Sequence, residues 1–409
     1  MAIKEIIVFV YLPGEPDAVP AGIFTHDSDL GVGEFAYGHR YLERSNAISV
    51  DPVALKLGVP PEAVTTNAGL YGAFRDASPD YWGRLVIAAE QKIASESISE
   101  IDFLLGSNAT RVGNLDFRDK PDSPEPKLEP PAFDQLSNII CAAENIEAGK
   151  TAEVHTLYLL RQGSSMGGAR PKCTVEWKDS LWIAKFPAKG DTVNIPGIEY
   201  ATMKLAKRCG INVPEVRVKS ISGKDIFLIQ RFDREKAVAG WLRKGFISSL
   251  SLMQLDEKDR FQWSYLSIAA FMRQYCSTDD LSQLFRRIVF NILVRNTDDH
   301  PRNHGFLVTE NGLSLSPAYD IVPELTPRGV GTDFNLAMTV GKTGREGTLE
   351  NAMSSCRQFG LTELQTKEIF EQMIDTVQNW NKLFIELGVT EREIKLLAPS
   401  FERCREVIK

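Results

Sequence analysis

Two aspartates, two histidines and two asparagines lie within residues 294–306, directly after an apolar helical pattern. Asp298 and Asn303 are five residues apart on a predicted loop. Alternating apolar residues then flank an Asn-Gly pair, which is the strongest short signal for a β-hairpin. Asp320 follows that hairpin. Because a hairpin returns the chain to its start, we expect Asp320 to lie beside Asn303.

These three side chains suit phosphoryl transfer. One carboxylate accepts or orients the proton of the attacking hydroxyl, and a second carboxylate with a neutral oxygen ligand holds Mg²⁺ on the phosphates. We therefore predict that Asp298 is the base and that Asn303 and Asp320 bind the metal.

Two other interpretations of the same stretch remain open on these residues alone. A polar turn with helix-capping aspartates would also be rich in Asp and Asn. A zinc site at His300 and His304 is disfavoured, because Pro301 argues against a continuous helix and the HExxH glutamate is missing. We expect Asp299 to be a cap on the solvent side of the loop.

A glycine-rich stretch, residues 163–172, holds three glycines and two serines between strand-like segments. Such a loop can fold its amide N–H groups around phosphate oxygens. It contains neither a Walker motif nor the SxxK spacing of acylating serine enzymes. A flexible surface hairpin would explain its composition equally well.

Lys185 stands in the middle of an apolar strand pattern, residues 181–187. A buried ammonium needs an anionic partner. The partner could be the triphosphate of a nucleotide or Glu199 on the following helical pattern. The alternative is an edge strand with Lys185 facing water, where a lysine deters aggregation.

The wider pattern predicts an α+β, bilobal protein-kinase-like fold with a β-rich N-terminal lobe and a mainly helical C-terminal lobe. The pieces follow one another in kinase order, from glycine-rich loop and strand lysine to Asp/Asn loop, hairpin and metal aspartate. The expected elements are strands at 6–12, 22–24 and 33–37, helices at 74–92 and 133–147, strand-rich sequence over 163–232 and mostly helix from 259. Pro-rich residues 119–131 predict an extended linker, so the expected domains are 1–118, 119–132 (linker), 133–234 and 235–409.

Composition narrows the classes of function. The formal charge of −7 over 409 residues argues against coating of nucleic acid or a basic membrane face, and it suits a basic partner. Six cysteines without CxxC spacing indicate neither a zinc site nor a disulfide framework. No stretch has the length of a spanning helix and no signal peptide is apparent, so we expect a cytoplasmic protein with no membrane partner.

The chain resembles the HipA family, the serine/threonine-kinase toxins of bacterial type II toxin–antitoxin modules. The segments that carry the resemblance are residues 76–84, 165–172, 185–187, 231–234, 296–303 and 316–323.

The resemblance implies roles for individual residues. Asp298 would be the catalytic aspartate, Asn303 and Asp320 the Mg²⁺ ligands, and Lys185 the lysine on the ATP phosphates. His300 would support the catalytic loop. The other cofactor-binding residues would be Ser165, Gly167, Gly168, Gln230, Phe232 and His300 itself.

Ser165 matches the loop serine that the family phosphorylates on itself, and Ser164 beside it is equally hydroxylated. Phosphoserine inside a phosphate-binding loop would repel ATP phosphates. Ile198 stands before Glu199 in place of the expected asparagine, which weakens the assignment of Glu199 as the partner of Lys185.

The resemblance also implies partners. These are a HipB-like helix-turn-helix antitoxin, operator DNA reached mainly through that antitoxin, and a protein substrate such as an aminoacyl-tRNA synthetase. The alternatives are a small-molecule or lipid kinase, because Asp-x-His-x-x-Asn also resembles phosphatidylinositol kinases, and a non-catalytic kinase-like corepressor.

Overall fold

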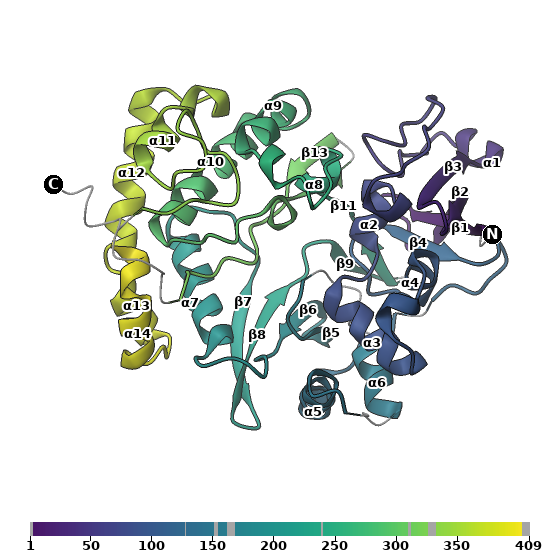
Figure 1. Cartoon of the computed structure of the whole chain (residues 1–409), viewed down its shortest axis with the longest axis horizontal. Helices are drawn as coiled ribbons and strands as arrows, with labels where there is room; N and C mark the ends of the chain where they lie inside the picture. Colours follow the sequence, from purple (N-terminus) through teal and green to yellow (C-terminus); the bar gives the residue numbers. More distant parts are fainter. Residues whose placement is uncertain are drawn as a thin grey trace. The chain divides into compact units, whose positions relative to one another are not determined.

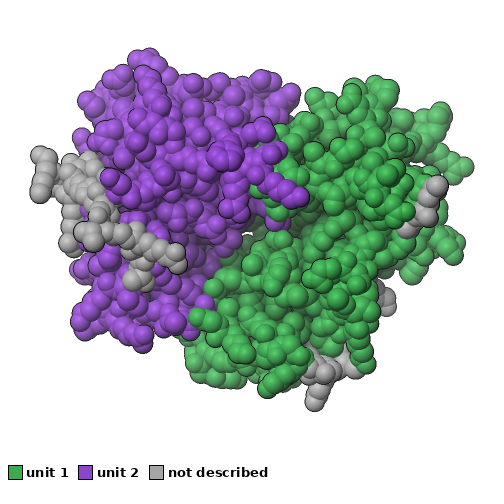
Figure 2. Space-filling model, viewed as in Figure 1, with its two compact units in different colours: residues 1–190, 219–257, 307–310 green, residues 191–218, 258–306, 311–409 purple. Residues whose placement is uncertain are grey.

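The computed structural model describes residues 3–126, 128–150, 154–161, 168–238, 240–309, 312–325 and 333–402. The chain divides into two compact units (Figure 2). Unit 1 comprises residues 1–190, 219–257 and 307–310, and unit 2 comprises 191–218, 258–306 and 311–409. The four domain boundaries expected from the sequence stay a prediction.

Unit 1 begins with an antiparallel sheet in the strand order β3-β2-β1-β4 (Figure 1). Its strands are β1 (Ile3–Tyr11), β2 (Ala18–Asp27), β3 (Val32–Tyr37) and β4 (Leu115–Arg118). Successive side chains of a strand face opposite sides, so Ile6, Val8 and Val10 share one face and are buried together. Nearby helices are α1 (His39–Leu42), α2 (Gly72–Ala77) and α4 (Glu100–Gly106). Phe74 of α2 and Leu104 of α4 complete this core.

A second sheet has the strand order β5-β6-β8-β7, and its first three strands lie in unit 1. The strands are β5 (Lys172–Trp177), β6 (Ser180–Lys185), β7 (Val216–Ile221) and β8 (Lys224–Gln230). Helices α3 (Tyr81–Gln91), α5 (Leu136–Glu147) and α6 (Val154–Arg161) contribute to the core of this sheet. Unit 1 also holds β9 (Arg234–Ala237), β10 (Gly240–Arg243), β11 (Gly245–Ser248) and α8 (Ser249–Leu252).

The helix expected over residues 74–92 is wrong as one element, because the chain forms α2 and α3 with a break at Ser78 and Pro79. Proline lacks the N–H that a helix interior requires, and it disfavours helical dihedrals at the residue before it. Ser78 is accordingly extended, with ψ 152°.

Unit 2 is mainly helical. Its helices are α7 (Ile195–Arg208), α9 (Tyr265–Tyr275), α10 (Thr278–Leu293), α11 (Leu349–Met353), α12 (Glu363–Val377), α13 (Trp380–Glu386) and α14 (Glu391–Leu397). The α10 helix lies in the core, where Phe285 contacts Phe359 and Phe370 at ring-centroid distances of 5.2 and 6.2 Å. The predicted hairpin is confirmed as β12 (Gly305–Thr309) and β13 (Gly312–Leu315).

The predicted α+β class is therefore confirmed, with a β-rich N-terminal part and a more helical C-terminal part. Across the described residues, none of the helices combines the length and apolar character needed to span a bilayer.

Candidate active site

The candidate site lies on the loop that joins α10 to β12. The α10 helix begins at a capping box, in which the side chains and amides of Ser277 and Asp280 bond reciprocally. Beyond its end, Arg295 adopts a left-handed φ of 49° and turns the chain away from the helix axis. Arg295 Nε donates to Glu324 Oε2 at 2.9 Å, and Glu324 N donates to Arg295 O at 3.0 Å. The start of the loop is thereby tied to the segment that follows Asp320.

Asp298 presents its carboxylate outward. Its side chain is 87% exposed, and His300 Nε2 lies 3.9 Å from Asp298 Oδ1. Neighbouring protein atoms that displace water raise the pKa of Asp298, as does Asp320, whereas His300 and Arg260 lower it. Because the side chain is largely open to solvent, screening limits this shift. An incoming hydroxyl can therefore reach the Asp298 carboxyl group from solvent.

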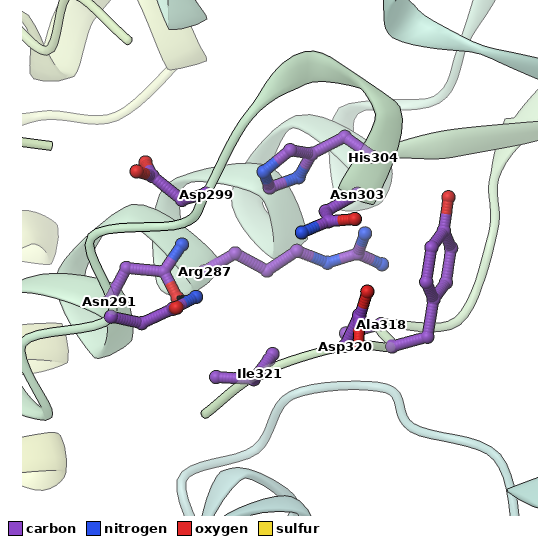
Figure 3. A pocket seen from close by; sticks show the side chains of 10 residues that line it. Arg287, Asn291, Asp299, Asn303, His304, Ala318, Asp320 and Ile321 are labelled. Atoms are coloured by element: carbon purple, nitrogen blue, oxygen red, sulfur yellow. Dashed lines mark hydrogen bonds between the residues drawn. The ribbon is translucent and has the colours of Figure 1, made fainter. Parts of the chain in front are cut away.

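Asn303 and Asp320 line the same pocket of unit 2 (Figure 3). Asn303 ends the short 3-10 helix η5 (Pro301–Asn303), and its Nδ2 donates to Asp298 O at 2.8 Å. Asp320 follows β13 with a left-handed φ of 59°, an uncommon conformation for a residue other than glycine. Such backbone conformations concentrate at functional sites.

The donors in this pocket fit Mg²⁺. Because Asn303 commits its amide nitrogen to Asp298 O, its Oδ1 could serve as an oxygen ligand, and the Asp320 carboxylate lines the same pocket. Mg²⁺ takes one or two such protein oxygens and completes its octahedron with water and phosphate. In the described part of the chain, no three His, Cys, Asp or Glu side chains converge as metal ligands.

Asp299 is not the solvent-side cap that we expected, because its side chain is only 1% exposed. Its Oδ2 accepts from Tyr265 Oη at 2.5 Å and its Oδ1 accepts from Ala337 N at 2.7 Å. Burial raises the pKa of Asp299 to about 6, although both hydrogen bonds act in the opposite direction. The second aspartate of the pair therefore faces the interior of unit 2.

The buried hydrogen-bond network around Asp299 was not predicted from the sequence. Asn291 Nδ2 donates to Tyr265 Oη at 3.1 Å, and Asn296 Nδ2 donates to Asn291 Oδ1 at 3.1 Å. His304 Nε2 lies 3.3 Å from Tyr265 Oη. Burial lowers the pKa of His304 well below its usual range, and Arg287 adds to this effect, so the ring is neutral. The available signal was the spacing of Arg287 and Asn291, two polar residues four positions apart that lie among the apolar residues of the buried face of α10.

Of the predicted cofactor-binding residues that the structure describes, Gly168, Lys185, Gln230 and Phe232 lie in unit 1, and His300 lies in unit 2. Lys185 is on β6, which pairs with β5 and β8, so the edge-strand alternative is wrong. Its Nζ is 5.8 Å from the ring centre of Phe227. Gln230 Nε2 donates to Ser180 Oγ at 3.2 Å, and the ring of Phe232 lies 6.4 Å from that of Phe246.

The glycine-rich loop is described only from Gly168 onward. Gly168 has a φ of 106°, and its N–H donates to Asp80 Oδ2 at 2.6 Å. Ser164, Ser165 and Gly167 lie outside the described residues.

Glu199, the predicted partner of Lys185, is buried on α7 in unit 2. Lys185 belongs to unit 1. The pairing between the two side chains stays a prediction.

A family model described as the HipA-like C-terminal domain matches residues 164–380, more than half of the chain. The chain therefore belongs to this family, as the sequence resemblance predicted.

Named relatives match shorter segments. A Haemophilus influenzae protein named "Putative kinase" is 31% identical over 183 residues, which are 40% of this chain and 53% of that protein. The "Serine/threonine-protein kinase toxin HipA" of Shewanella oneidensis is 24% identical over 144 residues, which are 30% of this chain and 33% of that protein. The chain thus spans about half the length of the first of these relatives and a third of the second.

A chain of the Shewanella oneidensis complex of HipA, HipB and operator DNA matches over 97% of both chains, with a TM-score of 0.69 and 17% identity. The likeness establishes a shared fold.

Proposed function

We propose that this chain is an ATP-dependent serine/threonine protein kinase and the toxin of a HipBA-type toxin–antitoxin module. The observation that carries the proposal is the arrangement of Asp298, Asn303 and Asp320 in unit 2, where an outward carboxylate adjoins two oxygen donors of one pocket. Membership of the HipA-like family and the names of the relatives support it.

In this proposal Asp298 orients the acceptor hydroxyl and takes its proton as the hydroxyl oxygen bonds to the γ-phosphorus and ADP leaves. Asn303 fixes the loop through its bond to Asp298 O, and with Asp320 it would hold Mg²⁺. That ion, when bound, neutralises charge on the phosphates. His300, 3.9 Å from Asp298 Oδ1, keeps the loop oriented.

We assign the nucleotide to residues of unit 1. Lys185 would contact the phosphates, because an ammonium on an internal strand gains most from an anionic partner. Ser165 and Gly167 would surround the phosphates with backbone amides, and the amide of Gly168 would join them by exchanging its bond to Asp80 Oδ2 for one to phosphate. Gln230 and Phe232, at the end of β8 and just beyond it, would hold adenine.

The family likeness extends the proposal to partners. A basic helix-turn-helix antitoxin suits the net charge of −7, and operator DNA would be reached mainly through it. The complex of the structural relative with HipB and operator DNA supports this arrangement. The substrate would be a protein such as an aminoacyl-tRNA synthetase, and phosphorylation of Ser165 or Ser164 would switch the kinase off by repelling ATP.

The test is to incubate the purified chain with ATP and Mg²⁺ and to map incorporated phosphate by mass spectrometry. Asp298→Asn removes the proposed base, and Asp375→Asn is the matched control because Asp375 is an exposed aspartate of α12. We expect phosphate on Ser165 or Ser164 in the unchanged chain and in Asp375→Asn, and none in Asp298→Asn.

Binding of ATP without phosphate transfer to this chain or to any protein would contradict the proposal. That result would favour the non-catalytic corepressor, or the small-molecule or lipid kinase if labelled small acceptors turn over.

A further inference from the structure

Asp299 belongs to a closed ring of contacts that joins the catalytic loop to a distant segment. Its carboxylate bonds to Ala337 N and to Tyr265 Oη. Two residues beyond Ala337, Thr339 O accepts from Tyr265 N at 3.0 Å, and Thr339 N donates to Trp263 O at 3.0 Å. The path from Asp299 through Ala337 and Thr339 to Tyr265 therefore returns to Asp299.

The same ring reaches the catalytic loop a second time. The indole of Trp263 lies 6.4 Å from the imidazole of His300, in an edge-on arrangement. Asp299 and His300, the two residues that directly follow Asp298, are thus both in contact with residues 263–265. Asp299 is 1% exposed, whereas the adjacent Asp298 side chain is 87% exposed. The two hydrogen bonds to the Asp299 carboxylate consequently fix the direction in which the adjacent Asp298 side chain faces solvent.

We propose, building on the kinase function above, that Asp299 and Tyr265 are positioning residues that lock the loop bearing Asp298 to residues 337–339. The lock keeps the base aimed at the acceptor hydroxyl and makes the loop and this segment one ordered body. Neither residue contacts the reacting atoms, so neither is a catalytic residue.

A positioning role for Tyr265 and a simple packing role predict different effects when the hydroxyl group is removed. Tyr265 is fully buried. Its Oη donates to Asp299, accepts from Asn291 and lies within hydrogen-bond distance of His304 Nε2. Removal of the hydroxyl leaves the aromatic ring in place and releases one of the two bonds to Asp299. We therefore expect slower transfer at unchanged ATP affinity, because the metal and nucleotide ligands proposed above are other residues.

The test compares Tyr265→Phe, Asp299→Ala and Asp299→Asn with Tyr41→Phe. Tyr41 is the matched control because it is a buried tyrosine of unit 1 whose Oη donates to Ile48 O at 2.7 Å. Each protein is measured for kcat and for KM of ATP in phosphate transfer, and for hydrogen–deuterium exchange in peptides covering 296–304 and 333–341.

We expect kcat to fall at least about tenfold in Tyr265→Phe and Asp299→Ala, since small misplacements of reacting groups are costly. KM for ATP should change less than about twofold, and both peptides should exchange faster. Asp299→Asn should restore slow exchange at 333–341, because its amide oxygen still accepts from Ala337 N. Tyr41→Phe should leave all three quantities unchanged.

Wild-type kcat and wild-type exchange in Tyr265→Phe would overturn the inference, even if Asp299→Ala fails to fold. A loss of kcat accompanied by an equal rise in KM, without faster exchange, would overturn it too. If the unchanged chain transfers no phosphate, the proposed function fails, while the exchange data still decide whether Asp299 links the loop to residues 337–339.

Discussion

Asp233 of unit 1 and Asp299 of unit 2 are equally buried, at 2% and 1% exposure, yet their carboxyl groups behave in opposite ways. Asp233 accepts from Arg231 at 2.9 and 2.7 Å and from Arg234 at 2.8 Å. Burial alone would raise the pKa of Asp233, but the two guanidinium groups lower it far below its usual range. Asp299 receives only neutral donors, and its pKa is raised to about 6.

The two networks therefore respond differently to pH: that of Asp233 is constant over the physiological range, whereas that of Asp299 changes with protonation. The arginines around Asp233 also donate to backbone carbonyls, from Arg231 to Thr110 O at 2.6 Å and from Arg234 to Gly113 O at 2.8 Å. Two guanidinium groups keep the Asp233 carboxylate ionised, so this network ties distant segments of unit 1 together at any physiological pH. The network of Asp299 relies on hydrogen bonds alone, so its strength depends on a proton. It lies beside the proposed base, where adjustment can affect catalysis.

Asp233→Asn should have the largest effect on stability. It leaves Arg231 and Arg234 as buried cations without a counter-charge, which costs about 3–5 kcal/mol. Denaturant unfolding would measure the loss, with Asp375→Asn as the exposed control. A change of less than about 1 kcal/mol would show that water or other groups already compensate the arginines.

The pH dependence of Asp299→Asn is the second prediction. The folded-state pKa of Asp299 is raised from 3.8 to about 6, so the folded protein binds the proton more tightly than the unfolded chain. The resulting stability is complete below about pH 4 and is lost as pH rises through about 6, a difference of about 3 kcal/mol. The free energy of unfolding of the unchanged chain, minus that of Asp299→Asn, should therefore fall over this range.

Thermal unfolding at a series of pH values would measure this difference. The neighbouring Asp298, His304 and Tyr265 are present in both proteins, so their own titrations largely cancel. A flat difference between pH 4 and 7 would contradict the prediction.

The smallest effect is expected for an exposed ion pair of unit 1. Lys4 Nζ lies 2.7 Å from Asp102 Oδ1, but the two side chains are 44% and 39% exposed. Solvent screening limits such pairs to about 1 kcal/mol or less. Lys4→Met should therefore change the free energy of unfolding by no more than this, and a larger loss would show that burial is not what distinguishes Asp233.

Features specified by neighbouring residues were predictable from the sequence. The turn preference of Asn311-Gly312 located the β12–β13 hairpin, and the order of the motifs indicated the fold class. The same reasoning missed the break at Ser78 and Pro79, because the helical pattern on both sides hid it.

Features specified by distant residues were not predictable in this way. Tyr265 and Ala337 lie 34 and 38 positions from Asp299, and no local pattern shows that they converge on it. An aspartate in a polar loop is most simply a solvent-facing cap, and only the returning segment buries it. Lys185 was ambiguous for a similar reason, since the pairing partner that makes β6 an internal strand begins at Lys224.

The most direct test of the central claim is the initial rate of phosphate transfer from ATP by Asp298→Asn, measured per folded molecule beside the unchanged chain. Loss of a positioned base should lower that rate by about 10²- to 10⁴-fold, with ATP binding retained. A rate within about threefold of the unchanged chain would contradict the assignment of Asp298 as the catalytic base.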